Sequence, residues 1–138
     1  MNDMLVAATL DAIRTYGDAA AERFYRDLRD NKLSSTRCEA CGEVAFPPRS
    51  FCPSCHEQER IRWFELPTRG TLYAFTQQER SVRFGKPDVI GLVELPGVGR
   101  ILTKIDAPFE ALQIGQAVEL CFVTLSEELT LHQFRPSH

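Results

Sequence analysis

The N-terminal part of the chain has the spacing of amphipathic helices. Between Asp18 and Arg29, apolar residues recur at intervals of three and four, which is the period of one helix face; they are Ala21, Phe24, Tyr25 and Leu28. Asp18 can cap this helix, and Asp3 can cap an earlier one that stops at Tyr16 and Gly17. The apolar stripe must be buried, either against the chain's own domain or against a partner chain.

From about Thr68 onward the pattern is that of β-strands. Runs rich in apolar and β-branched residues lie at 70–76, 89–95, 101–105, 117–124 and 129–134. A short helical segment separates the third run from the fourth, with Asp106 as its cap, Pro108 in its first turn and Gly115 as its stop. Five strands with a short helix in this position predict an OB-fold barrel.

Four of the five cysteines form two Cys-x-x-Cys pairs, Cys38 with Cys41 and Cys52 with Cys55. Two such turns can bring four sulfurs onto one ion with tetrahedral geometry. A site closed by four thiolates leaves no position for water or substrate, so the metal is expected to be structural, and its loss is expected to unfold the ribbon. Tetrahedral sulfur suits zinc or iron, and the spacing leaves both open.

The predicted fold is therefore mainly β: an N-terminal helical segment over 1–33, a rubredoxin-like zinc ribbon over 34–66 and a five-stranded OB-fold domain over 67–138.

The 138 residues carry 16 basic and 19 acidic side chains, a net charge of −3, and this balance weighs against nucleic-acid binding. The first residues contain neither a secretion signal nor a membrane span, so we expect a cytoplasmic protein whose cysteines stay reduced.

The motifs of several enzyme classes are absent from the sequence. It contains no Gly-rich phosphate loop, no Gly-x-Ser-x-Gly elbow and no His-Glu-x-x-His pair. The fifth cysteine, Cys121, lies in an apolar strand without a neighbouring base and is interpreted as a core or sheet residue. Catalysis by this chain alone is not expected.

Several stretches together resemble a family of small acyl-CoA-associated proteins that have a rubredoxin-like zinc ribbon followed by an OB-fold. They are "FYRDLRDNKL", "RCEACGEVAFPPRSFCPSC", "TRGTLYAFT", "VIGLVEL", "LQIGQAVEL" and the closing "FRP". The resemblance implies an accessory subunit that pairs with a thiolase-like enzyme or a hydratase in a hetero-oligomer. Such subunits help to hold a CoA thioester, for example in sterol side-chain or aromatic-compound degradation or in ketoacyl condensation. The ligand positions carry over as Cys38, Cys41, Cys52 and Cys55, and no catalytic residue carries over.

The candidate CoA contacts lie mainly in the loop 77–87, between the first two barrel strands, where OB-folds commonly bind ligands. Cations for phosphate and a ring for adenine are found there: Arg80, Arg83, Phe84 and Lys86. The alternative is a loop whose charges contact only water. Arg49 is a further candidate for a phosphate or partner contact, or it braces the ribbon through backbone carbonyls.

The sequence is compatible with two other functions. A ribbon followed by an OB-fold also suits a single-stranded nucleic-acid binder, with stacking by Tyr73, Phe75 or Phe84. The other is an electron carrier with iron in the cysteine site. Trp63 and Phe64, just after the ribbon, are expected in the core between the domains and not in a stacking surface.

Overall fold

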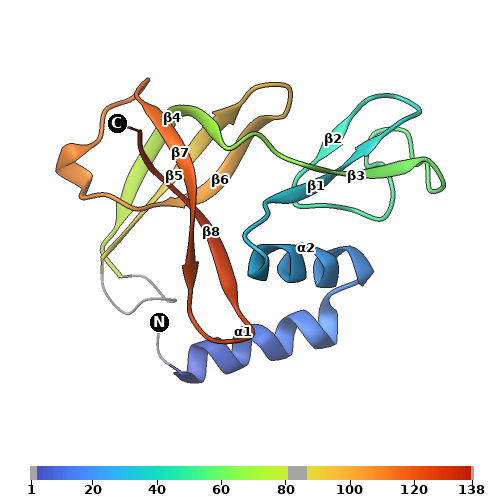
Figure 1. Cartoon of the computed structure of the whole chain (residues 1–138), viewed down its shortest axis with the longest axis horizontal. Helices are drawn as coiled ribbons and strands as arrows, with labels where there is room; N and C mark the ends of the chain where they lie inside the picture. Colours follow the sequence, from blue (N-terminus) through green and yellow to red (C-terminus); the bar gives the residue numbers. More distant parts are fainter. Residues whose placement is uncertain (1–2, 81–86, 138) are drawn as a thin grey trace.

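The computed structural model describes residues 3–80 and 87–137. Along the chain, two helices are followed by a small antiparallel sheet and then by a closed barrel (Figure 1). In the view of Figure 1 the first helix lies at the bottom, the second lies beneath the small sheet, and the small sheet lies to one side of the barrel. None of the described helices is long and apolar enough to cross a membrane.

The two helices, α1 (Asp3–Tyr16) and α2 (Ala19–Arg29), are separated at Gly17. The backbone N–H of Gly17 donates to the Ile13 carbonyl, and a Cβ at Gly17 would lie 2.3 Å from that oxygen, so only glycine fits. Asp18 caps α2, because its Oδ1 accepts a hydrogen bond of 2.9 Å from the N–H of Ala21. The predicted helix break and the Asp18 cap are both confirmed.

The apolar stripe of α2 is buried by the chain itself. Phe24 and Leu28 are buried, and α2 packs against β8 (Thr130–Pro136) and β1 (Ser34–Cys38). The Phe24 ring makes edge-to-face contacts with Phe46 and His132, at centroid distances of 5.9 and 6.1 Å. The stripe therefore joins the helices to both β parts of the fold and is not available to a partner chain.

The ribbon contains a three-stranded antiparallel sheet in the order β2-β1-β3. Its other strands are β2 (Val44–Ala45) and β3 (Ile61–Glu65). The hydroxyl of Ser35, which is buried, donates to the Ala45 carbonyl and ties β1 to the end of β2. The strand β1 ends at Cys38, and β2 begins just after the first cysteine turn. This sheet therefore positions the metal-binding turns.

The barrel has the strand order β4-β5-β6-β8-β7 and closes by pairing of β7 with β4. Its first four strands are β4 (Arg69–Gln78), β5 (Asp88–Leu95), β6 (Gly99–Ile105) and β7 (Ala117–Thr124). The pairing of β6 with β8 is parallel and the other pairings are antiparallel. A short 3₁₀ helix, η1 (Phe109–Ala111), lies between β6 and β7. The expected mainly β fold with a five-stranded OB-like barrel is confirmed.

The expected helix cap at Asp106 is wrong. The helical segment is only the single turn η1, with Pro108 in the position before its first residue and no side-chain cap. The backbone N–H of Asp106 instead donates to the Phe134 carbonyl at 2.8 Å, which extends the pairing between β6 and β8. Gly115, the expected stop, does adopt a positive φ of 91°, and its N–H donates to the Leu72 carbonyl.

One hydrophobic core runs from the barrel to the helices. Inside the barrel it contains Leu72, Val93, Ile101, Val118 and Phe134, each at most 1% exposed, and it continues through Leu28, Leu33 and Leu66. Leu66, at the end of the ribbon, donates its N–H to the Leu33 carbonyl at 2.9 Å. Helices, ribbon and barrel therefore share one packed interior in which the ribbon is held against the barrel.

Candidate functional site

The two cysteine turns have the same backbone construction. In the first, the N–H of Gly42 donates to the Cys38 carbonyl at 2.8 Å, and in the second the N–H of His56 donates to the Cys52 carbonyl at 2.9 Å. In each turn the first cysteine also donates its N–H to the carbonyl of a glutamate five residues later, Glu43 or Glu57. The repeat Cys-x-x-Cys-x-Glu therefore corresponds to one structural unit used twice.

The residue after each second cysteine needs a left-handed backbone. Gly42 has a φ of 82° and His56 has a φ of 67°. Glycine adopts this region freely, and histidine is among the side chains that tolerate it better than most. His56 is therefore placed by the geometry of the turn, and its side chain is not part of the group of metal-ligating atoms found in the described residues.

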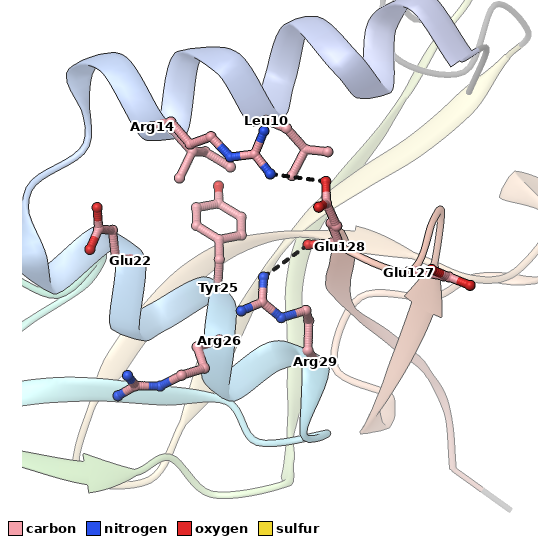
Figure 2. Close-up of a pocket in the computed structure, with 9 residues that line it drawn as sticks. Leu10, Arg14, Glu22, Tyr25, Arg26, Arg29, Glu127 and Glu128 are labelled. Atoms are coloured by element: carbon pink, nitrogen blue, oxygen red, sulfur yellow. Dashed lines mark hydrogen bonds and ion pairs between the residues drawn. The ribbon is translucent and has the colours of Figure 1, made fainter.

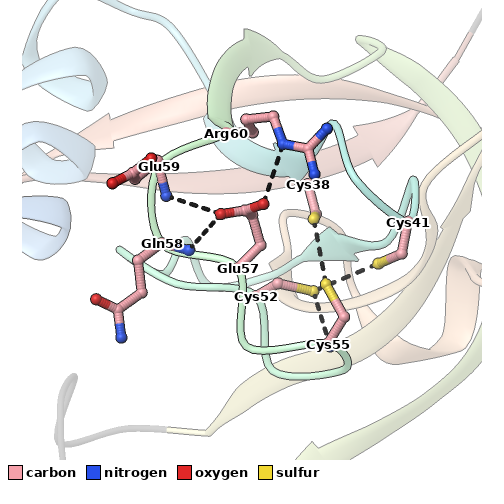
Figure 3. Close-up of polar contacts among 8 residues, drawn as sticks. All are labelled: Cys38, Cys41, Cys52, Cys55, Glu57, Gln58, Glu59 and Arg60. Carbon is pink, nitrogen blue, oxygen red and sulfur yellow. Dashed lines mark hydrogen bonds and ion pairs between the residues drawn. The ribbon is translucent and has the colours of Figure 1, made fainter.

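The four cysteine sulfurs converge on one point (Figure 3). The sulfurs of Cys38 and Cys55 are 3.6 Å apart, those of Cys41 and Cys52 are 3.5 Å apart, and all four lie within 4.8 Å of one another. A tetrahedron with Zn–S bonds of about 2.3 Å has S–S edges of roughly 3.8 Å. The four thiols fit a single tetrahedral ion, and the structure brings together all four predicted ligands.

The four thiols and the backbone around them shift one another's pKa values even without an ion. The backbone N–H of Cys55, which donates to the Cys52 sulfur at 3.5 Å, lowers the pKa of Cys52 to about 7. The backbone N–H of Glu43 lowers the pKa of Cys41, but the hydrogen bond to the Cys52 sulfur, burial and the other thiols together raise it to about 12. Four adjacent thiolates repel one another, so they become stable together only when a cation binds and the remaining protons leave.

A carboxylate fixes the segment that leaves the second turn. Glu57 accepts hydrogen bonds from the backbone N–H groups of Gln58 and Glu59 and from Nε of Arg60, at 3.0, 3.2 and 3.0 Å (Figure 3). These bonds lower the pKa of Glu57, with the N–H of Glu59 as the largest cause. The glutamate shared by "CEACGE" and "CPSCHE" corresponds to the backbone carbonyl that closes each turn, and the sequence did not predict the carboxylate contacts of Glu57.

The candidate CoA contacts are only partly described by the structure. Arg83, Phe84 and Lys86 lie outside the described residues, and Arg80 is exposed just beyond the end of β4. Arg49 is also exposed, and its backbone N–H donates to Thr36 Oγ1 at 3.1 Å. Within the described parts of the chain its guanidinium makes no hydrogen bond to the cysteine turns, so the structure gives no support to the bracing role.

A cleft of about 350 Å³ opens beside this loop, between β5, β6 and the segment that carries η1. Acidic residues predominate among its charged lining: Asp88, Asp106 and Glu110, against the single cation Lys104. Lys104 lies 3.8 Å from Asp88, whose side chain is buried. The described part of the cleft is therefore not a phosphate site on its own charges.

The aromatic residues near the ribbon and on the barrel are mostly engaged with other side chains. Trp63 and Phe64 are half-buried, and Phe64 packs against the core, while Arg23 lies over the Trp63 ring at 4.4 Å from its centroid. Phe75 packs against the core and against Phe109, with ring centroids 5.3 Å apart. Phe75 is therefore a packing residue and not a free stacking surface for a base.

A second pocket, of about 500 Å³, lies between α1, α2 and the turn that joins β7 to β8 (Figure 2). Arg14 forms an ion pair of 2.9 Å with Glu128, and Arg29 donates to the Glu128 backbone carbonyl at 3.1 Å. The charged side chains lining the pocket balance: three arginines, Arg14, Arg26 and Arg29, and three glutamates, Glu22, Glu127 and Glu128. Its charged contacts fasten α1 to the barrel, and the pocket shows no excess charge that would select an ion.

A four-cysteine ribbon followed by a closed five-stranded barrel defines a zinc-ribbon and OB-fold protein. Two family models match in the same order: the rubredoxin-like zinc ribbon domain of ChsH2 over residues 27–59 and the C-terminal OB-fold domain of ChsH2 over residues 63–123. The chain belongs to the DUF35 family. It is 31% identical to a DUF35 domain-containing scaffold protein of Methanocaldococcus jannaschii. That match covers 80% of this chain and 82% of the archaeal protein.

Two further similarities involve proteins named as subunits. The chain is 31% identical to the benzoylsuccinyl-CoA thiolase subunit BbsA of Thauera aromatica, over 73% of this chain and 70% of BbsA. It is 30% identical to a probable enoyl-CoA hydratase alpha subunit of Thermomonospora curvata over 83% of this chain, but over only 36% of that longer protein. The suspected family is thereby confirmed.

Solved structures agree with this assignment. A chain of a structure described as the Ltp2–ChsH2(DUF35) aldolase superposes with a TM-score of 0.74 at 27% identity, covering 86% of this chain and 95% of that one. A DUF35 family protein from Sulfolobus solfataricus superposes with a TM-score of 0.61 at 20% identity, which shows the shared fold. The cysteine ribbon, which the matched family describes as a zinc ribbon, fits zinc as its structural ion.

Proposed function

We propose that this chain is an accessory subunit of an acyl-CoA enzyme. It would bind a thiolase-like or hydratase partner in the cytoplasm, help to hold the acyl-CoA substrate and supply no nucleophile. The observation that carries the proposal is the similarity to BbsA, a thiolase subunit of nearly the same extent. The superposition on the DUF35 chain of an aldolase structure supports it from the fold.

The chemistry of the chain's own residues favours a structural role for the metal. Four cysteines complete the coordination of a tetrahedral ion, so a zinc held here has no position for a substrate oxygen or for water. The zinc would stabilise the ribbon, and the chain's residues would keep it against the barrel through Leu33 and Leu66. Burial raises the pKa of the Cys121 thiol, which makes it a poor nucleophile at neutral pH.

The proposal is tested by purifying the tagged chain from its native cells, identifying the co-purified protein by mass spectrometry and measuring metal in the eluate. A thiolase-like or hydratase subunit recovered together with about one zinc per chain supports the proposal. An enzyme subunit that is fully active, stable and soluble without this chain overturns it. Iron with visible absorbance, or recovered nucleic acid without an acyl-CoA enzyme, would favour the alternative functions instead.

The CoA contacts form a separate part of the proposal. Arg80, Arg83, Phe84 and Lys86 would meet the nucleotide end of CoA, and Arg49 would supply a further cation. Truncating Arg83 and Lys86 together is expected to weaken CoA binding by the assembled complex, with Arg49→Ala as a variant at the second location. Unchanged CoA affinity of the complex in the double variant would remove the loop from the site.

A further inference from the structure

One outer face of the barrel carries a row of apolar side chains. The register of β4, β5 and β6 places Leu72, Val93 and Ile101 in one row, and all three point into the core. The next row contains Ala74, Leu92 and Leu102, so alternation along the strands directs these side chains outward. Ala74 and Leu92 are half-buried, and Leu102 is 60% exposed.

A bulge in β4 adds an aromatic residue to this row. The register of β4 against β5 shifts between Leu72 and Ala74, which makes Tyr73 the extra residue of the bulged strand. Its side chain is 43% exposed, and the Arg100 guanidinium lies over its ring at 3.6 Å from the centroid. The stacked arginine favours one orientation of the ring, and the side chain stays partly exposed.

Charged pairs border the apolar residues at both ends. Arg100 on β6 lies 3.8 Å from Glu94 on β5 at one end, and Lys104 on β6 lies 3.8 Å from Asp88 on β5 at the other. Ile90 extends the apolar centre toward the second pair. An apolar centre with a tyrosine and an arginine, surrounded by a polar rim, is the composition found at the centres of protein interfaces.

The chain's own helices cover other parts of the barrel. The main contacts of α2 are with β8 and β1, and α1 contacts α2 (Figure 1). Within the barrel, β5 lies in the middle of this face and is paired with β4 on one side and with β6 on the other. A partner that lies over β5, at the centre of this face, would therefore meet side chains and not backbone.

We propose that the face formed by Tyr73, Ala74, Ile90, Leu92 and Leu102 docks the acyl-CoA enzyme subunit of the preceding section. This inference rests on that proposed function. The matching partner surface has an apolar centre, with a carboxylate placed to meet Arg100. Arg100 is suited to this because its exposed pairing with Glu94 is weak and can be exchanged for a partner's carboxylate.

The charge of the chain and the names of its relatives favour an enzyme subunit over a second copy of this chain. A stable interface buries about 800 Å² on each side, contributed by 20 to 30 residues, so the five side chains form only its centre. A second copy would bring the same net charge of −3 to the contact, and the two would repel. The relatives named as subunits of a thiolase and a hydratase indicate the class of protein that supplies the surface.

The test compares two surface variants with a matched control in binding to the co-purified enzyme subunit. Leu102→Glu places a charge in the apolar centre, and Tyr73→Ala removes the ring beneath Arg100. Met4→Glu on α1 is the control, because Met4 is also an exposed apolar residue, at 78%, on a different element. Zinc content and the urea midpoint of each variant establish that it is folded before affinity is measured by calorimetry.

Both face variants are expected to weaken binding at least about tenfold, while Met4→Glu binds as the unchanged protein does. If the unchanged protein binds the enzyme and both face variants bind equally well, the docking face is wrong and the proposed function stands. If the unchanged protein binds no acyl-CoA enzyme subunit, the proposed function fails first and the inference with it. Self-association of this chain that Leu102→Glu abolishes would assign the face to a second copy and overturn the proposal.

Discussion

Gly42 and His56 hold the same position in the two cysteine turns, and both have a positive φ. A side chain in this region costs about 1 kcal/mol, and no atom near Gly42 would obstruct a Cβ, so the cost there is conformational. Gly42→Ala is therefore expected to lower the free energy of unfolding of the zinc-loaded protein by about 1 kcal/mol. Urea unfolding measures this change.

His56→Gly is the matched control for that substitution. It relieves the same strain but adds freedom to the unfolded chain, so the two effects largely cancel, and the free energy of unfolding should change by less than about 1 kcal/mol. Its zinc content should not change, because His56 is not a ligand. A loss of zinc in His56→Gly, or an unchanged stability of Gly42→Ala, would contradict the description of the two turns.

Cys121 provides a second prediction at the scale of single residues. Burial raises the pKa of this thiol, so its reactive thiolate is scarce at neutral pH and becomes more abundant as the pH rises. In the zinc-loaded protein a thiol reagent at pH 7 should modify at most one cysteine, slowly, and faster at higher pH. A chelator should then release the four ligand cysteines, and Cys121→Ala should lack the slow phase. Rapid modification of Cys121 at pH 7 would show that its thiol is not protected.

At the scale of elements, the start of α2 depends on one side chain. Asp18 Oδ1 accepts from the N–H of Ala21, and loss of such a cap costs about 1 kcal/mol. Asp18→Ala should lower the free energy of unfolding by this amount, while Asp18→Asn should retain most of it because an amide oxygen also accepts the bond. Urea unfolding of both variants tests the cap; equal losses would indicate that charge, and not the hydrogen bond, is what matters there.

The ribbon is the element that depends most on the metal. Its sheet contains strands of five, two and five residues, which are too short to be stable without the ion that joins the two turns. Chelation, or Cys52→Ser, should therefore abolish amide protection in β1 and β3, measured by hydrogen exchange. The control is Cys121→Ser, which removes a cysteine outside the cluster. Full protection of β1 and β3 in the metal-free protein would show that packing alone holds the ribbon.

The difference between the packed barrel and the metal-dependent ribbon also explains which elements the sequence could predict. The barrel strands were predicted to within two residues at each end, because their apolar and β-branched runs are buried on the inner side. The ribbon strands were not predicted, since "SSTRC" and "IRWFE" are only five residues long and "SSTRC" is largely polar, and their pairing is imposed by the cysteine turns. The Asp106 cap was predicted wrongly, because a local helix signal competed with pairing to Phe134, which is distant in sequence.

At the scale of the whole molecule, spacing in the sequence revealed the metal cluster but not the apolar face of the barrel. Cys-x-x-Cys pairs encode their own local geometry, so four ligands could be named from the chain alone. The outer face depends on a bulge at Tyr73 and on the register of three strands, and neither can be predicted from a short segment of the sequence. The aromatic residue Tyr73 was noted as a possible stacking residue, but its arginine partner lies 27 positions away along the chain.

The charge of the whole molecule leads to the last prediction, on CoA binding. The chain has a net charge of −3, and the described lining of the cleft beside loop 77–87 contains three carboxylates and one lysine. Phosphates approaching this chain by itself are therefore poorly neutralised, and under the proposed function cations from the partner would complete the site. CoA should bind the assembled complex at least about tenfold more tightly than it binds this chain, in calorimetric titrations at equal salt.

The contribution of the chain's own cations can be isolated in the same titrations. Arg80→Ala is the informative variant, since Arg80 lies at the entrance to the loop, and Arg14→Ala is the control because Arg14 lies in the pocket between the helices. A loss of CoA affinity in Arg80→Ala alone would mean that loop 77–87 completes a site shared with the partner. Equal and tight binding of CoA by the isolated chain would instead mean that the loop's cations outweigh the acidic cleft, and that the substrate can be held before the partner is recruited.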